Sequence, residues 1–169
     1  SETGITNAGE VKNFDSTLRI GKKAAKRMDL YSQYAVDTAL QAIEDAGITE
    51  ENTASEDMGV IFGSGIGGLT TIQEQVIKMH EKGPKRVSPL FVPTAIANMA
   101  AGNIALRVKA KNICTSIVTA CSSGTNSIGE AYRQIKECRA KVMLTRGAEA
   151  SVHEIGIAGF APFTALSGQ

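Results

Sequence analysis

Residues 113–145 read ICTSIVTACSSGTNSIGEAYRQIKECRAKVMLT. The apolar residues at the start of this stretch predict a strand over 113–120. They are followed by a predicted helix over 122–137, which gathers apolar side chains on one face, and by a second predicted strand over 141–145. A helix that joins two strands forms a crossover unit, and crossover units build parallel sheets. This stretch therefore indicates an α/β fold.

The alternation of strand and helix signals extends toward the N-terminus. A polar, weakly patterned lead-in over residues 1–27 precedes a predicted helix over 29–46, which Asp29 can cap. The short apolar run over 58–62 is typical of a strand that is buried on both faces. A polar helix is predicted over 70–81. These elements add a further strand and helix to the same domain.

Prolines and small residues shape the middle of the chain. Pro89 and Pro93 bracket residues 90–92, which we expect to be extended. A helix is predicted over 94–108. Its sequence is dominated by alanine and other small residues, which allow close packing in a buried layer.

The bulk composition is that of an ordinary soluble globular domain, with 43% hydrophobic and 21% charged residues among 169. The 18 basic and 17 acidic residues leave a net charge of +1, which gives no general reason to expect nucleic acid or an anionic membrane as a partner. No apolar run reaches the ~18 residues that a membrane-spanning helix needs. The basic run over 22–27 is either a solvated approach to the next helix or a docking patch for an acidic partner.

The three cysteines are expected to be free thiols. Cys114, Cys121 and Cys138 have spacings that match no zinc signature. Their odd number, in a chain without a signal peptide, argues against a disulfide framework. A reducing, cytoplasmic location fits this pattern best.

Cys121 is a candidate nucleophile because it lies where the predicted strand gives way to the predicted helix. The start of a helix offers free backbone N–H groups and a positive partial charge, which stabilise a thiolate and can hold the oxyanion of a thioester under attack. The residues that follow, Ser122, Ser123 and Gly124, are small and leave room for an acyl chain or a cofactor arm. The alternative is an inert thiol that packs as a small hydrophobic side chain.

Two other functions are less well supported. Residues 63–68 read GSGIGG and match the dinucleotide-binding pattern, but no second strand ending in an acidic residue follows about 20 positions later. We expect these glycines to allow a close approach of the backbone instead. A cysteine hydrolase needs a histidine beside the thiol, and the sequence holds only His80 and His153. A lone histidine is more often a surface residue than a base.

The chain resembles the β-ketoacyl-acyl carrier protein synthase II family. Residues 118–131, around Cys121, resemble the nucleophile motif of that family. The segments 26–29, 63–68 and 88–93 agree with it in order and spacing, as does the later run GAEA that begins at Gly147. The resemblance runs from about residue 26 to the end of the chain.

The resemblance implies a thiolase-like fold, in which two βαβαβαββ halves pack as five αβαβα layers, and a homodimer. Residues 1–169 would be the N-terminal half of one ketosynthase subunit, without the opening strand and the C-terminal half. The implied reaction is fatty acid elongation. Cys121 accepts an acyl group from acyl carrier protein, and a decarboxylative Claisen condensation with malonyl-acyl carrier protein follows. No metal or bound organic cofactor is implied.

The resemblance also assigns the acyl pocket. Ile66 and Phe160 should line the pocket beside Ala120, and Phe91 should close its end from the other subunit. Ordinary core packing is the alternative for Ile66, Phe91 and Phe160.

Some parts of the family pattern are missing or altered. The family uses two histidines for decarboxylation, and a lysine and a phenylalanine gate, all from the second half. Within the sequence, Arg146 replaces a usual glycine or alanine, and Cys138 stands where glycine is common. The alternatives are therefore a catalytically incomplete fragment and a non-condensing thiolase-like relative.

Overall fold

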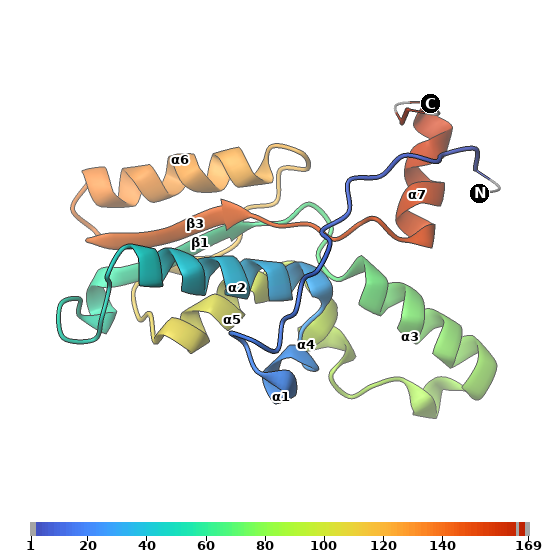
Figure 1. Ribbon diagram of the computed structural model, residues 1–169, viewed down its shortest axis with the longest axis horizontal. Coiled ribbons are helices and arrows are strands. Elements are labelled where there is room, and N and C mark those ends of the chain that lie inside the picture. Colours follow the sequence, from blue (N-terminus) through green and yellow to red (C-terminus); the bar gives the residue numbers. More distant parts are fainter. Residues whose placement is uncertain (1–2, 165, 168–169) are drawn as a thin grey trace.

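The computed structural model describes residues 3–164 and 166–167, and within them the centre is a parallel sheet of three strands in the order β2-β1-β3. β1 (Met58–Gly63) lies in the middle. It pairs with β2 (Cys114–Thr115) on one side and with β3 (Val142–Gly147) on the other. The α/β fold that the sequence predicts is confirmed (Figure 1).

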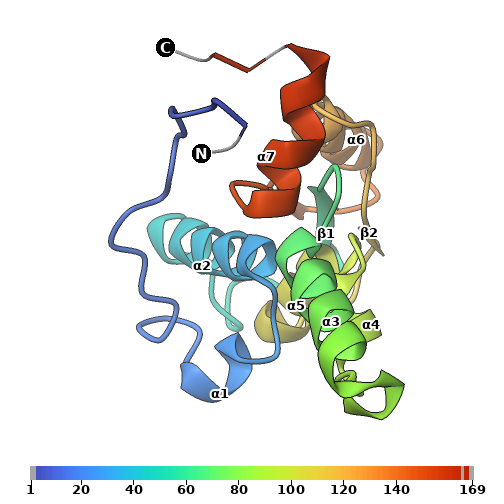
Figure 2. The same cartoon turned by 90° about the vertical axis from the view of Figure 1, so that its right-hand side faces the viewer.

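Helices cover both faces of this sheet. α6 (Ser123–Lys136) packs on one face, and α2 (Leu30–Asp45) and α5 (Met99–Val108) lie on the other (Figure 1). α3 (Leu69–Lys82) and α7 (Glu154–Phe160) extend beyond the end of the sheet where the strands finish (Figure 1), and they lie nearest the viewer in Figure 2, which looks from that end. The shorter helices are α1 (Lys22–Ala25), α4 (Phe91–Ala95) and the 3₁₀ turns Ser55–Asp57, Pro84–Arg86 and Ala161–Phe163.

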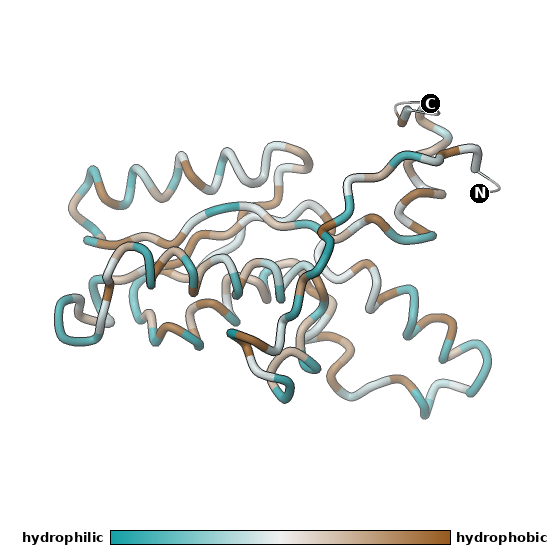
Figure 3. Tube along the Cα trace, in the orientation of Figure 1, coloured by the Kyte–Doolittle hydropathy of each residue, from teal (hydrophilic) through white to brown (hydrophobic). Residues whose placement is uncertain are grey.

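The main hydrophobic core lies between the sheet and the pair α2 and α5. Val60 and Phe62 of β1 pack there against helical side chains that include Tyr31 and Ile104. Hydrophobic segments gather in the layer of strands, whereas α3 and α6 alternate between hydrophilic and hydrophobic residues (Figure 3). Within the described residues, no helix is long and apolar enough to cross a membrane.

Most of the predicted elements are confirmed. The side chain of Asp29 caps α2 by accepting a hydrogen bond from the Tyr31 N–H at 3.2 Å. β1 is buried along its whole length, as the apolar run predicts. The helix predicted over 70–81 is α3, and the one predicted over 122–137 is α6. The lead-in over residues 1–27 is mostly irregular but contains the single turn of α1.

The strand predicted over 113–120 is wrong for most of its length, because regular pairing ends at Thr115. The hydroxyl of Ser116 donates a hydrogen bond to the carbonyl oxygen of Phe62 at 2.7 Å. A side chain thus takes a backbone acceptor on β1 just beyond the last paired residues. The chain from residue 116 to residue 119 runs on to Cys121 without joining the sheet.

The extended segment predicted over 90–92 is also wrong, because Phe91 begins α4. Pro93 is tolerated because it lies in the first turn of that helix. The helix predicted over 94–108 is interrupted at Ile96, and α5 begins only at Met99. The physical reason is that two carbonyl groups are bonded from outside. The Ala95 carbonyl accepts from the Gly68 N–H at 2.9 Å, and the Ile96 carbonyl accepts from the Tyr31 hydroxyl at 2.7 Å.

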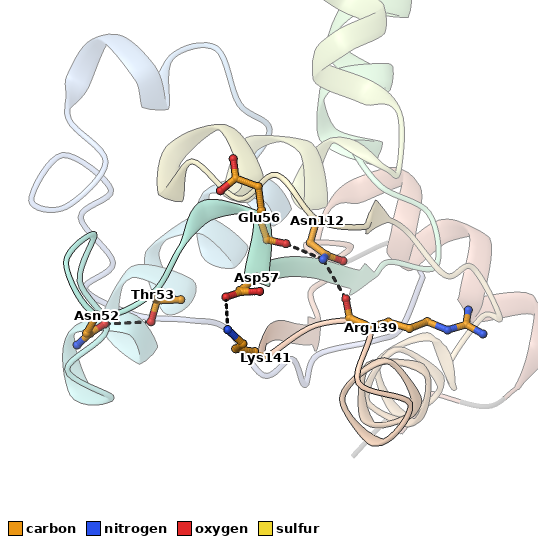
Figure 4. A network of polar contacts seen from close by, with 7 residues as sticks. All are labelled: Asn52, Thr53, Glu56, Asp57, Asn112, Arg139 and Lys141. Carbon is orange, nitrogen blue, oxygen red and sulfur yellow. Dashed lines mark hydrogen bonds and ion pairs between the residues drawn. The ribbon is translucent and has the colours of Figure 1, made fainter.

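A polar network joins the segments that lead into the three strands (Figure 4). The side chain of Asn112 donates to the carbonyl oxygens of Glu56 at 2.7 Å and of Arg139 at 3.0 Å. Lys141 and Asp57 form an ion pair at 2.7 Å, and exposed pairs of this kind contribute little to stability. The Asn112 side chain therefore joins the segments before β1 and β3 at this end of the sheet, opposite the end where β1 meets the Cys121 turn.

The structure explains why glycine suits position 138. Cys138 has φ +57°, in the left-handed region that glycine adopts without strain. Its N–H donates to the Ile135 carbonyl at 3.0 Å, and the Arg139 N–H donates to the Gln134 carbonyl at 2.9 Å. These two bonds form a Schellman motif at the C-terminus of α6.

We therefore expect Cys138→Gly to raise the free energy of unfolding by about 0.5–1 kcal/mol, since relief of backbone strain exceeds the entropy that glycine adds to the unfolded chain. Urea unfolding of the full-length protein under reducing conditions would measure this. Cys138→Ser, which keeps the strain, is the matched control and should leave stability nearly unchanged. Equal stability of the two variants would contradict the strain argument.

Candidate active site around Cys121

A cavity of about 610 Å³ lies where β1 and β3 end and α6 begins. Its walls include four of the residues that the sequence singles out: Ile66, Ala120, Cys121 and Phe160. They come from three separate parts of the chain. Ile66 lies on the turn after β1, Ala120 and Cys121 lie on the turn before α6, and Phe160 ends α7.

Phe91 does not line this cavity within the described residues. It is half-buried at the start of α4. The predicted contact with the pocket of a second subunit therefore stays a prediction.

Hydrogen bonds fix the turn that carries Cys121. The Ser123 hydroxyl donates to the Ala120 carbonyl at 2.7 Å and accepts from the Thr119 N–H at 2.9 Å. The Ser122 hydroxyl donates to the Thr119 carbonyl at 2.7 Å. Ala120 itself has φ +52°, a strained conformation for a residue with a side chain. Such strain persists only where surrounding contacts hold it, and it leaves the Cys121 side chain exposed at the cavity.

The sequence predicts a role for Ser122 and Ser123 only through their small size. The hydrogen bonds of their hydroxyl groups were not predicted. A hydrogen bond between Asn126 and Thr119 was not predicted either. The side-chain amide of Asn126 donates to the Thr119 hydroxyl oxygen at 2.7 Å. Because Asn126 lies in the first turns of α6, this bond ties the helix back to the chain that precedes Cys121. A threonine hydroxyl such as that of Thr119 is a common signal near helix starts, but its pairing with Asn126 could not be predicted from the sequence.

The start of α6 supplies fewer free donors than the sequence predicts. The Ser122 N–H donates to the Thr119 carbonyl at 3.2 Å, and the Ser123 N–H donates to the Ala120 carbonyl at 3.1 Å. These two groups are therefore not available to a bound oxyanion. The positive end of the helix dipole still lies two residues from Cys121, where it favours a negative charge on a nearby group.

Glycines seat α6 closely on the sheet beneath the nucleophile. A side-chain carbon added at Gly147 would lie 2.8 Å from the Cα atom of Gly124, closer than real atoms approach. Gly147 ends β3 and Gly124 lies in the first turn of α6. The start of α6 therefore cannot move closer to the sheet, which limits the movement of Cys121 in that direction.

Two charged residues also line the cavity, Arg146 and Glu149. Nothing in the structure explains why arginine stands at position 146. Glu149 binds the turn that carries Ile66, a role that the sequence did not reveal.

Neither histidine lines the cavity. The Nδ1 atom of His153 lies 2.7 Å from the side-chain oxygen of Gln73, and His153 precedes the first residue of α7. This arrangement gives no support to a cysteine hydrolase that uses His153 as its base.

The three cysteines differ in setting although all three are exposed. Partial burial raises the pKa of the Cys114 thiol, which lowers the fraction of reactive thiolate at a given pH. Cys138 lies just after the C-terminus of α6 and does not line the cavity. Cys121 alone combines exposure with a helix start and a cavity.

Comparisons with known proteins agree with this geometry. Residues 2–169 match the model of the family described as "Beta-ketoacyl synthase, N-terminal domain". A 3-oxoacyl-[acyl-carrier-protein] synthase 2 of Staphylococcus aureus is 44% identical over 160 residues, which cover 95% of this chain and 39% of that protein. The enzyme of the same name from Synechocystis is 43% identical over 167 residues, 99% of this chain and 40% of that protein. The chain thus spans about two fifths of the length of these relatives.

Solved structures show the same fold. The ishigamide ketosynthase/chain length factor superposes with a TM-score of 0.90 at 27% identity, over 99% of this chain and 42% of that one. A β-ketoacyl synthase from Burkholderia phymatum gives 0.80 at 28% identity, over 94% and 39%. A polyketide ketosynthase solved in complex with its acyl-carrier protein gives 0.86 over 92% and 45%, and at 19% identity it supports the fold alone.

Proposed function

The chain belongs to the β-ketoacyl synthase family, and from that membership we propose that it carries the acyl-accepting part of a β-ketoacyl-acyl carrier protein synthase of fatty acid synthesis. The observation that carries the proposal is the position of Cys121. Its thiol is exposed in a strained and firmly bonded turn, at the start of a helix and at a cavity wide enough for an acyl chain.

The proposed reaction has two stages. The Cys121 thiolate attacks the thioester carbonyl of an acyl-carrier protein, a new carbon–sulfur bond forms, and the carrier's thiol leaves. Malonyl-carrier protein then loses carbon dioxide, and the resulting carbanion attacks the acyl-cysteine, which releases Cys121. The β-ketoacyl product leaves on the carrier protein.

We propose that residues 1–169 form the N-terminal half of the subunit. The two histidines that the family uses for decarboxylation have no counterpart at the cavity, since neither His80 nor His153 lines it. α6 also exposes an apolar face: Ile128, Tyr132 and Ile135 are 53%, 62% and 45% exposed. A face of this kind is typically covered by other protein. A second half would supply both the cover and the histidines.

The acyl chain is proposed to lie along Ile66, Ala120 and Phe160, which share the cavity with Cys121. A homodimer, in which Phe91 closes the partner's cavity, is supported by the sheet edge. Among the described residues β2 and β3 each pair only with β1, so each has an edge open to a further strand, and we propose the edge of β2 for the partner subunit.

Acyl carrier protein is the proposed partner, in its acyl and malonyl forms. It is an acidic protein, and two basic clusters offer docking surfaces. One is the run over 22–27, whose four basic side chains are exposed, and the other surrounds a groove lined by Lys78, Lys82, Lys85 and Arg86. A location in the cytoplasm, expected from the free thiols, stays a prediction.

The test is a mass measurement. After incubation of the full-length protein with carrier protein that bears an acyl group, we expect one acyl group per subunit on the peptide that contains Cys121, and none on Cys114 or Cys138. Malonyl-carrier protein should then remove the adduct and release carbon dioxide and β-ketoacyl product. A stable adduct without carbon dioxide would indicate a non-condensing relative. Absence of an adduct would refute the assignment of Cys121.

A further inference from the structure

One carboxylate oxygen accepts two backbone hydrogen bonds from the turn after β1. The Oε2 atom of Glu149 accepts hydrogen bonds from the Gly65 N–H at 3.0 Å and from the Ile66 N–H at 2.9 Å. The hydroxyl of Ser64, a buried residue, lies 3.4 Å from the same oxygen and accepts from the Gly67 N–H at 3.1 Å. Bonds from N–H groups to a carboxylate are stronger than those between neutral groups.

The other side of the turn is held by a backbone hydrogen bond and by close packing. The Gly68 N–H donates to the Ala95 carbonyl at 2.9 Å. Gly67 has φ +85°, and a side-chain carbon there would lie 2.8 Å from the Cα atom of Ala97. The turn is thus wedged between the joint of α4 and α5 on one side and Glu149 on the other. The Glu149 carboxylate is a part of this arrangement that a substitution can remove without a backbone change.

Glu149 reaches the turn because the two strands end in register. Gly63 of β1 pairs with Gly147 of β3, and Glu149 follows two residues later. Its bonds to the turn therefore close the gap between the strand ends, at the wall of the cavity that Ile66 also lines. No lysine or arginine in the described part of the chain forms an ion pair with Glu149, so the turn itself is the partner of its charge.

We propose that Glu149 is a positioning residue that holds Ile66 in the cavity wall and so sets the chain length that the cavity accepts. The inference rests on the proposed function, because it takes the cavity beside Cys121 to be the acyl site. Glu149 does not touch the reacting atoms in this proposal. It acts through the backbone of Gly65 and Ile66.

The first experiment measures hydrogen exchange in the full-length protein. In Glu149→Ala, the Gly65 and Ile66 amides should exchange about tenfold faster or more, since each loses a charged acceptor. In Glu149→Gln the side-chain oxygen can still accept both bonds, so most of the protection should return. Glu50→Ala removes an exposed carboxylate that pairs with Lys109 far from the cavity and is the matched control. Unchanged exchange in Glu149→Ala would overturn the proposal.

The second experiment measures cavity shape without relying on catalysis. N-alkylmaleimides of increasing chain length alkylate Cys121 directly, and the ratio of rates for long and short reagents reports the space beyond the thiol. We expect that ratio to change about fivefold or more in Glu149→Ala, and to return toward the wild-type value in Glu149→Gln. Ile66→Phe, which fills the same wall, is the positive control for the readout.

The outcomes separate this proposal from the proposed function. Faster amide exchange with an unchanged chain-length ratio would show that Glu149 only supports the fold, and would overturn the positioning role. A changed ratio that glutamine does not restore would also count against it. Failure of the carrier-protein test described above would refute the synthase function while leaving both of these measurements interpretable.

Discussion

Cys121→Ala is expected to abolish acyl transfer, with turnover of the full-length enzyme lowered by about 10⁴-fold or more. The reason is that Cys121 is the only thiol at the cavity among the described residues, and two nearby serine hydroxyls are poor replacements for it. The Ser123 hydroxyl donates to the Ala120 carbonyl and accepts from the Thr119 N–H, so it is fully engaged in the turn. The Ser151 hydroxyl is buried without a partner in the described structure, and a neutral serine hydroxyl is a much weaker nucleophile than a cysteine thiolate.

Cys114→Ala and Cys138→Ala are the matched controls for this loss. Each removes one exposed thiol while leaving the turn around residue 121 intact, so each should retain near wild-type turnover. Mass spectrometry of the adduct would complement the rate measurement. An acyl group that still forms on Cys121→Ala protein would place the nucleophile elsewhere and refute the site.

Local signals explain why much of the fold could be predicted from the sequence. The Asp29 cap and the apolar run over 58–62 each specify an element through residues that are close together in the chain. The missed break at Ile96 has a different origin. The hydroxyl that captures its carbonyl belongs to Tyr31, 65 residues away, and no local pattern records that bond.

The same distinction applies to the site. Cys121 is a candidate from its position at the predicted helix start, whereas Ile66, Ala120 and Phe160 come from the resemblance to a family. The fold brings all four to one cavity. In the sequence, Glu149 is recognisable only as part of the GAEA run that begins at Gly147. Its role depends on backbone groups 83 and 84 residues earlier, which become neighbours only when β1 and β3 pair.

Helix α6 shows the limit of hydrophobic periodicity. The pattern correctly predicts a helix, but of the apolar residues that mark its face only Ala131 is buried, whereas Ile128 and Tyr132 are exposed. The face that packs on the sheet is built from small and polar residues such as Ser123 and Ser127. Close approach to the glycines of the strands selects for small size there, and a hydropathy pattern does not record size.

That close approach leads to the second large effect. Gly63→Ala is expected to lower the free energy of unfolding by about 2–3 kcal/mol and to reduce acylation of Cys121. The added carbon would lie 2.5 Å from the Ser123 carbonyl oxygen and 2.8 Å from the Ser127 hydroxyl oxygen. The Ser127 hydroxyl already donates to that same carbonyl at 2.8 Å, so the two groups hold each other in place. β1 cannot retreat either, because it is paired on both sides.

The start of α6 must therefore move, and it carries the Cys121 turn with it. Urea unfolding and the rate of Cys121 acylation should both report the change. Gly102→Ala is the matched control, because a carbon added in the middle of α5 meets only the Met99 side chain at 3.8 Å, an ordinary contact. It should raise stability by about 0.5–1 kcal/mol through helix propensity. Adding Ser127→Ala to Gly63→Ala should not restore stability, since the clash with the Ser123 backbone remains. Wild-type stability of Gly63→Ala would show that α6 can shift without cost, and would remove the basis for a fixed nucleophile.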